Sequence, residues 1–405
     1  MSSYAQEIVV LVLVIVTALG FDFTNGFHDT GNAMATSIAT GALKPKTAVA
    51  LSAILNLVGA FLSVEVATTV TTSVLRIQQS STGDLVSGIT AETALTIILA
   101  GLVGGILWNL CTWLLGLPSS SSHALFGGLI GAGIASGGLA RVNWDGLFAK
   151  VLIPALASPF VAGLVAVIGT FFIYMITRSV TSRGKEGSFR WGQIATASLV
   201  SLAHGTGDAQ KTMGVIALAL IAHGSLTTES IVANGIPPWI ILSCGLAIAL
   251  GTYLGGWRVI RTLGKGLIEI DAPQGMAAQA SSAAIILTSS HFGMALSTTH
   301  VASGSIVGAG VGRPGAKVRW SVAGRMAAGW VMTLPAAGAI GAVCYYAAQL
   351  VGGLAGAVLI FVMLIAASAV IYARSRRNAI GAGNVNDQWD TTPTAPAAND
   401  PQTVA

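Results

Sequence analysis

The chain is a succession of long apolar runs separated by short polar segments. A membrane-spanning helix needs about 20 apolar residues, and eleven runs approach or exceed that length. The predicted segments are 6–38, 47–70, 92–116, 121–140 and 147–177, then 191–220, 237–257, 274–295, 297–312 and 321–346, and finally 350–373. The pattern predicts an all-α polytopic membrane protein with about 10–12 transmembrane segments.

Polar residues interrupt the first run over residues 20–41, GFDFTNGFHDTGNAMATSIATG. Asp22, Asn25, Asp29 and Asn32 stand where a spanning helix should simply continue. A charge near the bilayer centre costs several kcal/mol, so such residues face a partner, a cavity or a pathway. The glycines among them favour an unwound helix, which a membrane tolerates only where it lines an enclosed site. We therefore expect a binding site at a broken helix centre.

The same pattern returns in the second half of the chain. The segment 204–213, HGTGDAQKTM, aligns with residues 25–34, so that Asp208 matches Asp29 and Lys211 matches Asn32. A second motif recurs after almost the same spacing, with SSSH ending at His123 and STTH ending at His300. Two unrelated motifs repeated in one order indicate an internal duplication. Paired interrupted segments in two halves point to the site of a secondary transporter.

The runs 121–140 and 297–312 are short and glycine-rich, and each follows or begins with a Ser/Thr-His motif. They are re-entrant hairpins or full spans, and the sequence leaves both open. Glycines spaced four apart in both segments favour close helix packing over substrate contact.

Charge placement predicts how the halves are arranged. Basic residues gather in five segments, and placing all five in the cytoplasm is consistent with an odd number of crossings, five, in each half. An odd number of crossings makes the two repeats inverted. The predicted divisions are a first repeat (1–177), a cytoplasmic linker (178–190), a second repeat (191–346), an extra transmembrane helix (347–373) and a disordered cytoplasmic tail (374–405).

Composition agrees with a multi-pass protein of the cell membrane. Hydrophobic residues make up 53% of the chain and charged residues 9%, against about 25% charged in soluble domains. The mean hydropathy is +0.76. The net charge of +5 reflects loop orientation, so we expect no nucleic-acid partner.

The polar residues suit a tetrahedral oxyanion. Half-helix N-termini offer backbone N–H groups to an anion, and hydroxyls, amides and a lysine add donors. The predicted substrate-binding residues are Asn25, Asp29, Asn32, Ser120, Ser121, Ser122, Asp208, Gln210, Lys211, Ser297, Thr298 and Thr299. The predicted coupling-ion residues are Asp22, Asp29, Asp208, His123 and His300. We expect no resident metal and no cofactor.

These motifs resemble a known family. GFHDTGNAMATSIATGAL and AHGTGDAQKTMG resemble the two signature repeats of the inorganic phosphate transporter (PiT) family, and PSSSSH and STTH resemble its paired hairpin motifs. The resemblance covers about residues 6–346 and is closest to the bacterial low-affinity phosphate permeases. It implies symport of inorganic phosphate with protons, often as a divalent metal-phosphate complex, or with sodium.

Departures from the family pattern bear on the coupling ion. The sodium-coupled branch tends to keep a second asparagine in both signatures and a glutamate in the second helix; here Lys211 and Asn56 occupy those positions. The resemblance therefore favours proton coupling. The expected partners are inorganic phosphate, a coupling proton or sodium, and the lipid bilayer, with a homodimer left open.

Other functions compete with this interpretation. A permease for sulfate or another tetrahedral oxyanion is the nearest, but sulfate has no proton to donate to Asp29 or Asp208. An intramembrane hydrolase would use a serine of 119–122, with His123 as base and Asp29 as orienting group. Duplicated motifs in inverted halves speak against a single catalytic centre and against a channel built from rings of one motif.

Overall fold

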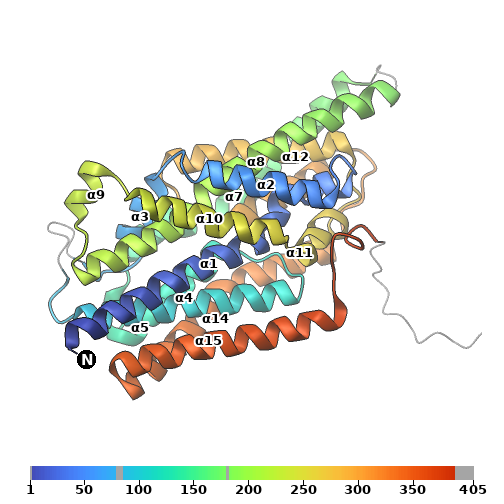
Figure 1. Ribbon diagram of the computed structural model, residues 1–405. Helices are drawn as coiled ribbons and strands as arrows, with labels where there is room; N and C mark the ends of the chain where they lie inside the picture. Colours follow the sequence, from blue (N-terminus) through green and yellow to red (C-terminus); the bar gives the residue numbers. More distant parts are fainter. Residues whose placement is uncertain (1, 79–84, 179–181, 388–405) are drawn as a thin grey trace, which may run out of the picture.

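The computed structural model describes residues 2–78, 85–178 and 182–387. In these ranges the regular secondary structure is helical, and the only β-type contacts are three isolated bridges. The helices are α1 (Ser3–Ala39), α2 (Pro45–Gly59), α3 (Glu65–Ser73), α4 (Ala91–Leu114), α5 (Ser121–Gly137), α6 (Trp144–Leu147), α7 (Ile153–Ile176), α8 (Ser182–His223), α9 (Thr228–Asn234), α10 (Pro238–Leu254), α11 (Trp257–Arg261), α12 (Ala272–His291), α13 (Thr298–Val311), α14 (Trp320–Val351) and α15 (Gly353–Ser375), with short turns η1 (Leu139–Arg141), η2 (Phe148–Leu152), η3 (Thr262–Gly266) and η4 (Arg376–Asn378). Most of the long helices run side by side along one direction (Figure 1). The prediction of an all-α polytopic membrane protein is confirmed.

Not every helix of the bundle could cross a membrane by itself. Among the described residues, five helical segments are long and apolar enough: Tyr4–Ala39, Ala91–Leu114, Trp144–Ile176, Trp320–Val351 and Gly353–Asn378. Pro238–Leu254 and Trp257–Gly266 would add a sixth, bent by 60°. The helices α2, α5 and α13 are shorter, with 15, 17 and 14 residues. The count of 10–12 transmembrane segments therefore stays a prediction.

The expected break in the signature helices is wrong. α1 runs uninterrupted for 37 residues and α8 for 42, straight through both polar motifs. The glycines serve packing instead of unwinding. A Cβ on Gly26 would lie 2.2 Å from the Ile248 carbonyl oxygen, and one on Gly205 would lie 2.1 Å from that of Asn56. The missing side chains let α1 press against α10, and α8 against α2.

The two Ser/Thr-His segments lie at the turns of two helical hairpins, α4–α5 and α12–α13. Because only α4 of these helices is long and apolar enough to cross a membrane, re-entrant hairpins and full spans both stay predictions. The start of α4 and the end of α5 lie near the same end of the bundle, where Leu75 before α4 bridges to Val142 after α5. α12 and α13 do the same at the other end, where the Gln274 side chain donates to the Ala309 carbonyl at 3.0 Å. The returning arms, α5 and α13, start inside the protein. Their first residues therefore meet at the centre from opposite ends.

Helix contacts occur in pairs that relate the two halves. α1 packs on α10 as α8 packs on α2, and α14 packs on the α4–α5 hairpin as α7 packs on the α12–α13 hairpin. This is the arrangement that an inverted duplication predicts. The hairpin of each half is thus covered by a helix of the other half, and the centre of the molecule is shared between them.

The segments rich in Lys and Arg lie at one end of the bundle, which we call the basic end: residues 40–46, 182–193, 258–275, 313–319 and 374–387. Contacts tie them together: Arg190 donates to the Ala42 carbonyl at 3.2 Å, and Arg319 to that of Lys265 at 2.6 Å. The positive-inside rule predicts that this is the cytoplasmic end. α8 begins here at Ser182, inside the segment predicted as a linker.

Part of the predicted disordered tail is ordered. After α15 the chain turns back across the basic end toward α11 (Figure 1). Val385 is 1% exposed in a cluster that includes Ile38, and Asn386 donates to the Ile38 carbonyl at 3.1 Å. The buried Val385 and the Ile38 carbonyl hold this segment in place. The low aliphatic content of the tail gave no sign of these contacts. Residues 388–405 lie outside the described residues.

Candidate functional site

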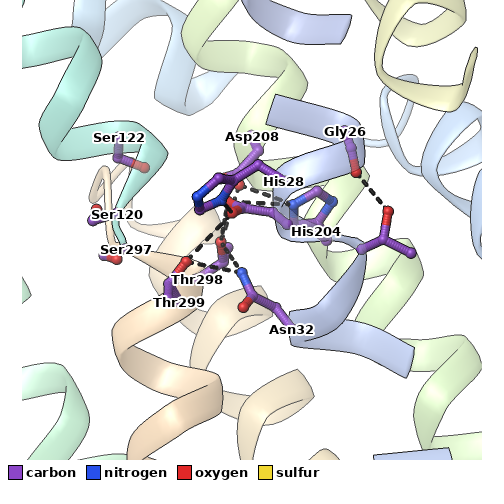
Figure 2. A network of polar contacts seen from close by, with 12 residues as sticks. Gly26, His28, Asn32, Ser120, Ser122, His204, Asp208, Ser297, Thr298 and Thr299 are labelled. Carbon is purple, nitrogen blue, oxygen red and sulfur yellow. Dashed lines mark hydrogen bonds and ion pairs between the residues drawn. The ribbon is translucent and has the colours of Figure 1, made fainter. Parts of the chain in front are cut away.

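The two signature carboxylates meet where α1 and α8 cross. Asp29 and Asp208 are each 1% exposed. His204 lies between them, with Nε2 3.1 Å from an Asp208 oxygen and 3.9 Å from an Asp29 oxygen (Figure 2). Its other nitrogen, Nδ1, lies 3.2 Å from the Asn56 amide oxygen, which orients the ring. The predicted pairing of the two repeats thus brings Asp29 and Asp208 to one imidazole.

A chain of polar groups leads from Asp29 to the α4–α5 turn. His28 Nδ1 lies 2.6 Å from Asp29 Oδ1, and His28 Nε2 lies 3.2 Å from the Thr112 hydroxyl. Ser119 Oγ lies 2.7 Å from the Thr112 hydroxyl and 3.4 Å from His28 Nε2. Buried groups in continuous contact of this kind can pass a proton or hold a charge in place.

Asp208 is paired with an ammonium. Lys211 donates to Asp208, to Ser122 Oγ at 2.6 Å and to the Leu296 carbonyl at 2.9 Å. Its three donors therefore reach three acceptors on different segments. Lys211 is 2% exposed, so the charge sits in the protein interior. A buried ammonium is stable there because a carboxylate and two further oxygens surround it.

The hairpin tips carry the predicted hydroxyls. Ser120 and Ser297 are the N-caps of α5 and α13, and each accepts the backbone N–H three residues later at 3.2 Å. Thr298 donates to Asp208 at 3.0 Å. The Asn32 amide donates to the Thr299 hydroxyl at 3.0 Å. Figure 2 shows Ser120, Ser122 and Ser297 grouped beside the carboxylates.

This arrangement can bind an anion and a proton together. Two helix N-termini point into the centre, and helix N-termini favour negative charge. One lysine and two histidines supply positive or titratable groups beside two carboxylates. The cavity next to Asp208, Lys211 and Thr298 measures about 10 Å³. Because about that much space holds one water, a larger ligand fits there only if the lining parts of α8, α12 and α13 rearrange.

Three groups at the centre could also hold a cation. One ligand atom each from Asp29, His204 and Asp208 lies within 4.8 Å of the other two. Carboxylate oxygen and imidazole nitrogen are ordinary ligands of divalent transition metals.

Three predicted residues lie apart from this cluster or lack partners in it. Gln210 caps another helix: its side-chain oxygen accepts the backbone N–H groups of Val66 at 2.7 Å and Ala67 at 3.3 Å, at the start of α3. Both carboxyl oxygens of Asp22 are buried without a hydrogen-bond partner among the described residues, as is the side-chain oxygen of Asn25.

The remaining predicted residues line the hairpin tips. The Ser121 hydroxyl is buried without a hydrogen-bond partner among the described residues. His123 and His300 contact each other, with ring centroids 4.9 Å apart, and His300 also stacks on Trp330 at 4.3 Å. His300 Nδ1 lies 3.2 Å from the Ala155 carbonyl oxygen. The two histidines therefore join the two hairpins at the start of α5 and α13.

The sequence analysis missed His204, Thr112 and the contact role of Asn56. His204 could have been found, because it stands one helical turn before Asp208 and aligns with Asn25, a predicted site residue. Thr112 carries no such signal, since a threonine in an apolar run more often bonds its own helix. Asn56 entered only through a family pattern, and its amide donates to the Thr252 hydroxyl at 2.8 Å.

The constellation required for the hydrolase alternative does not form. His123 contacts His300 edge to face, and neither nitrogen of His123 has a hydrogen-bond partner among the described residues. Within 119–122, Ser119 lies 3.4 Å from a histidine ring nitrogen, but that histidine is His28, which also contacts Thr112. The hypothesis of a catalytic triad made of a serine, His123 and Asp29 is therefore wrong.

The sequence of the chain is similar to those of known phosphate transporters. Residues 25–341 match the phosphate transporter family. The chain is 58% identical to a probable low-affinity inorganic phosphate transporter of Mycobacterium leprae (strain TN), over 95% of this chain and 89% of that protein. It is 41% identical to a protein of the same description from Bacillus subtilis (strain 168), over 84% of this chain and 97% of that protein.

A solved structure described as the sodium-dependent phosphate transporter shares the fold. The TM-score is 0.72 at 20% sequence identity, over 85% of this chain and all of that one. At this identity the likeness extends to the fold alone. The relatives are transporters by description, which removes the enzyme alternative.

Proposed function

Because the chain belongs to the phosphate transporter family, we propose that it imports inorganic phosphate across the cell membrane in symport with protons. The observation that carries the proton assignment is the pairing of Lys211 with Asp208 at the centre of the protein. The chain's own ammonium sits where a transported cation would otherwise neutralise the carboxylate.

Phosphate would bind where the two hairpin tips meet. There it takes hydrogen bonds from Ser120, Ser121 and Ser122 on one side and from Ser297, Thr298 and Thr299 on the other. Lys211 supplies the charge, and its bonds to Ser122 and the Leu296 carbonyl are the ones that phosphate replaces. Asn32 supports the opposite tip through Thr299. The protonated oxygen of monohydrogen phosphate can donate to Asp29 or Asp208, which sulfate cannot do at neutral pH.

The carboxylates are already surrounded by protein donors. Asp29 has His28 at 2.6 Å and two hydroxyls at 3.5 Å, and Asp208 has Lys211, His204 and Thr298. Removing a carboxylate from water is costly unless its lone pairs are satisfied, and here side chains satisfy them. This supports a centre that cycles protons without holding sodium.

The transported proton would move among the titratable groups at the centre. His28 and His204 each contact a carboxylate, and Asp22 lies on the same helix as Asp29. A buried carboxyl with no hydrogen-bond partner among the described residues needs a proton or a cation to be stable, so Asp22 remains a coupling-ion candidate. His123 and His300 are candidates only through their contact with each other at the hairpin tips.

A metal-phosphate complex is a second candidate substrate. The close approach of Asp29, His204 and Asp208 favours it, since a divalent cation bound to phosphate would meet three ligand atoms there. A homodimer also remains a proposal, which light scattering of the purified transporter tests.

Uptake of labelled phosphate into proteoliposomes tests the proposal. Saturable uptake should follow an imposed pH gradient, persist when choline replaces sodium, and resist competition by sulfate. Chelation of divalent cations then separates free phosphate from a metal-phosphate complex. Uptake that collapses without sodium would refute proton coupling, and uptake that ignores the pH gradient would refute it as well.

A further inference from the structure

A second cavity lies between α15 and the rest of the bundle, away from the central site. Its volume is about 630 Å³, and α1, α4, α10, α11 and α15 form its walls. Gly20, Phe23, Leu110, Ile365 and Ile371 give it an apolar lining. α15 lies outside the residues that match the family, at the outer edge of the bundle (Figure 1). One wall of the cavity is therefore an addition to the duplicated part, which forms the other walls.

The cavity faces the bilayer near the basic end. Leu254, Ile365 and Tyr372 on its rim are 58%, 54% and 61% exposed, on helices that cross or border the membrane. Trp113, Trp257 and Tyr372 line its end. Aromatic rings of this kind favour the level of the lipid headgroups. The lower part of the cavity thus lies at acyl-chain depth, and its mouth lies at headgroup depth.

Two arginines line the headgroup end. Arg258 is held in place by hydrogen bonds to three carbonyls, at 3.3 Å to Leu114, 3.0 Å to Ser375 and 2.5 Å to Asn378. Its guanidinium also lies 6.0 Å from the centre of the Trp113 ring. Arg376, just after α15, lines the same cavity and is exposed. Fixed positive charge at the mouth of an apolar groove complements a molecule with an acyl body and an anionic head.

We propose that this cavity binds an anionic phospholipid of the cytoplasmic leaflet, with its acyl chains along α1 and α15 and its phosphate at Arg376 and Arg258. Basic pockets between transmembrane helices on the cytoplasmic side recognise such headgroups. The phosphate of the lipid and free phosphate share this chemistry, but only the lipid has acyl chains to fill the apolar part of the cavity. The site is independent of the transport site, whose residues it does not include.

Two pairs of variants test the proposal in the full-length transporter. Arg376→Gln removes the headgroup charge, with Arg377→Gln as the control because Arg377 does not line the cavity. Gly20→Leu fills the acyl part: a Cβ at Gly20 meets no atom within 4 Å, so the helix accepts it without a clash. Gly324→Leu is its control, since Gly324 is equally open but lies on α14 outside the cavity.

The measurement is retained lipid by native mass spectrometry after exposure to phosphatidylglycerol or phosphatidylcholine, together with the thermal midpoint of each variant. Wild type should retain phosphatidylglycerol preferentially. Arg376→Gln should lower that preference about fivefold, the factor for about 1 kcal/mol from one arginine near a membrane. Gly20→Leu should lower retention of both lipids, and both controls should match wild type.

The assignment would be overturned by equal retention of the two lipids by wild type, by wild-type retention in Gly20→Leu, or by displacement of the lipid by inorganic phosphate. Equal loss in a variant and its control would also refute it. An unchanged thermal midpoint without lipid shows that each variant is folded, so that a loss of lipid reports the cavity.

Discussion

The two signature helices place equivalent carboxylates at one centre but surround them differently. In the first half, Asp29 is held by the neighbouring His28, and position 32 is a neutral asparagine. In the second half, Asp208 is held by Lys211, three residues further along the same helix. One half-site therefore pairs its carboxylate with a lysine, and the other has an asparagine at the equivalent position.

The contacts across the halves are nevertheless equivalent. Asn32 on α1 reaches Thr299 at the tip of the second hairpin, and Lys211 on α8 reaches Ser122 at the tip of the first. These two contacts correspond to each other in the duplicated sequence. The duplication thus supplies a symmetric frame, and one substitution within it makes the charge asymmetric. We infer that the difference between Lys211 and Asn32 decides which ion is coupled to transport. Phosphate binding instead depends on the contacts that the two halves share.

The largest expected effect comes from neutralising the carboxylates. Asp29→Asn and Asp208→Asn should each abolish uptake, because both carboxylates contact the central His204. Asp208→Asn should also lower stability by about 3–5 kcal/mol, since it leaves the buried Lys211 ammonium without its partner. Thermal unfolding and uptake of the two variants, measured side by side, test the difference. Wild-type uptake by both variants would place the site elsewhere.

Lys211→Asn removes the asymmetry directly. It gives the second half the residue of the first, and proton-driven uptake should be lost. If the rest of the half-site can then hold an ion, uptake by the variant becomes dependent on sodium. Uptake in choline and in sodium medium, at a fixed pH gradient, distinguishes these results. A variant that keeps wild-type proton-driven uptake would show that the ammonium has no part in coupling.

Replacing His204 should slow uptake more than replacing His28. His204 lies near both carboxylates, whereas His28 contacts only one of the two, Asp29. His204→Gln should slow uptake at least about tenfold, the factor for one hydrogen bond to a charged group, and flatten its pH profile. His28→Gln should have the smaller effect. The reverse order in uptake measured from pH 5 to 8 would contradict the central position of His204.

The hydroxyls at the hairpin tips should affect binding more than rate. Ser122→Ala and Thr299→Ala each remove a hydrogen bond worth about 1.5–3 kcal/mol when the ligand is charged. The half-saturation concentration for phosphate should rise about 10- to 100-fold in each variant. Similar rises in both would show that the frame is symmetric for phosphate. An unchanged value in both would remove the hydroxyls from the binding site.

The smallest effect on transport is expected at Gln210. Its side chain caps α3, so Gln210→Ala should cost about 0.5–2 kcal/mol of stability, as other lost helix caps do. The half-saturation concentration should stay at the wild-type value. A large rise at unchanged stability would instead support the role that the sequence analysis gave this residue.

The sequence by itself determined the helices and the residues at the centre. Hydropathy is a local property, and the apolar runs at 92–116 and 237–257 match α4 and α10 to within about three residues. The cost of burying Asp29 and Asp208 required a site, and the repeated motifs showed that the two carboxylates belong together. The hairpin tips followed from the second repeated motif.

Only the tertiary structure decided how these groups are paired. A buried polar residue must have a partner, but the sequence does not name it, because the partner depends on how helices cross. The crossing of α1 and α8 placed His204 between the carboxylates, and Gly26 and Gly205 served those crossings while both helices stayed intact. The same packing turned Gln210 toward α3 and brought His123 against His300. Local patterns fix which groups need partners, and the three-dimensional packing chooses them.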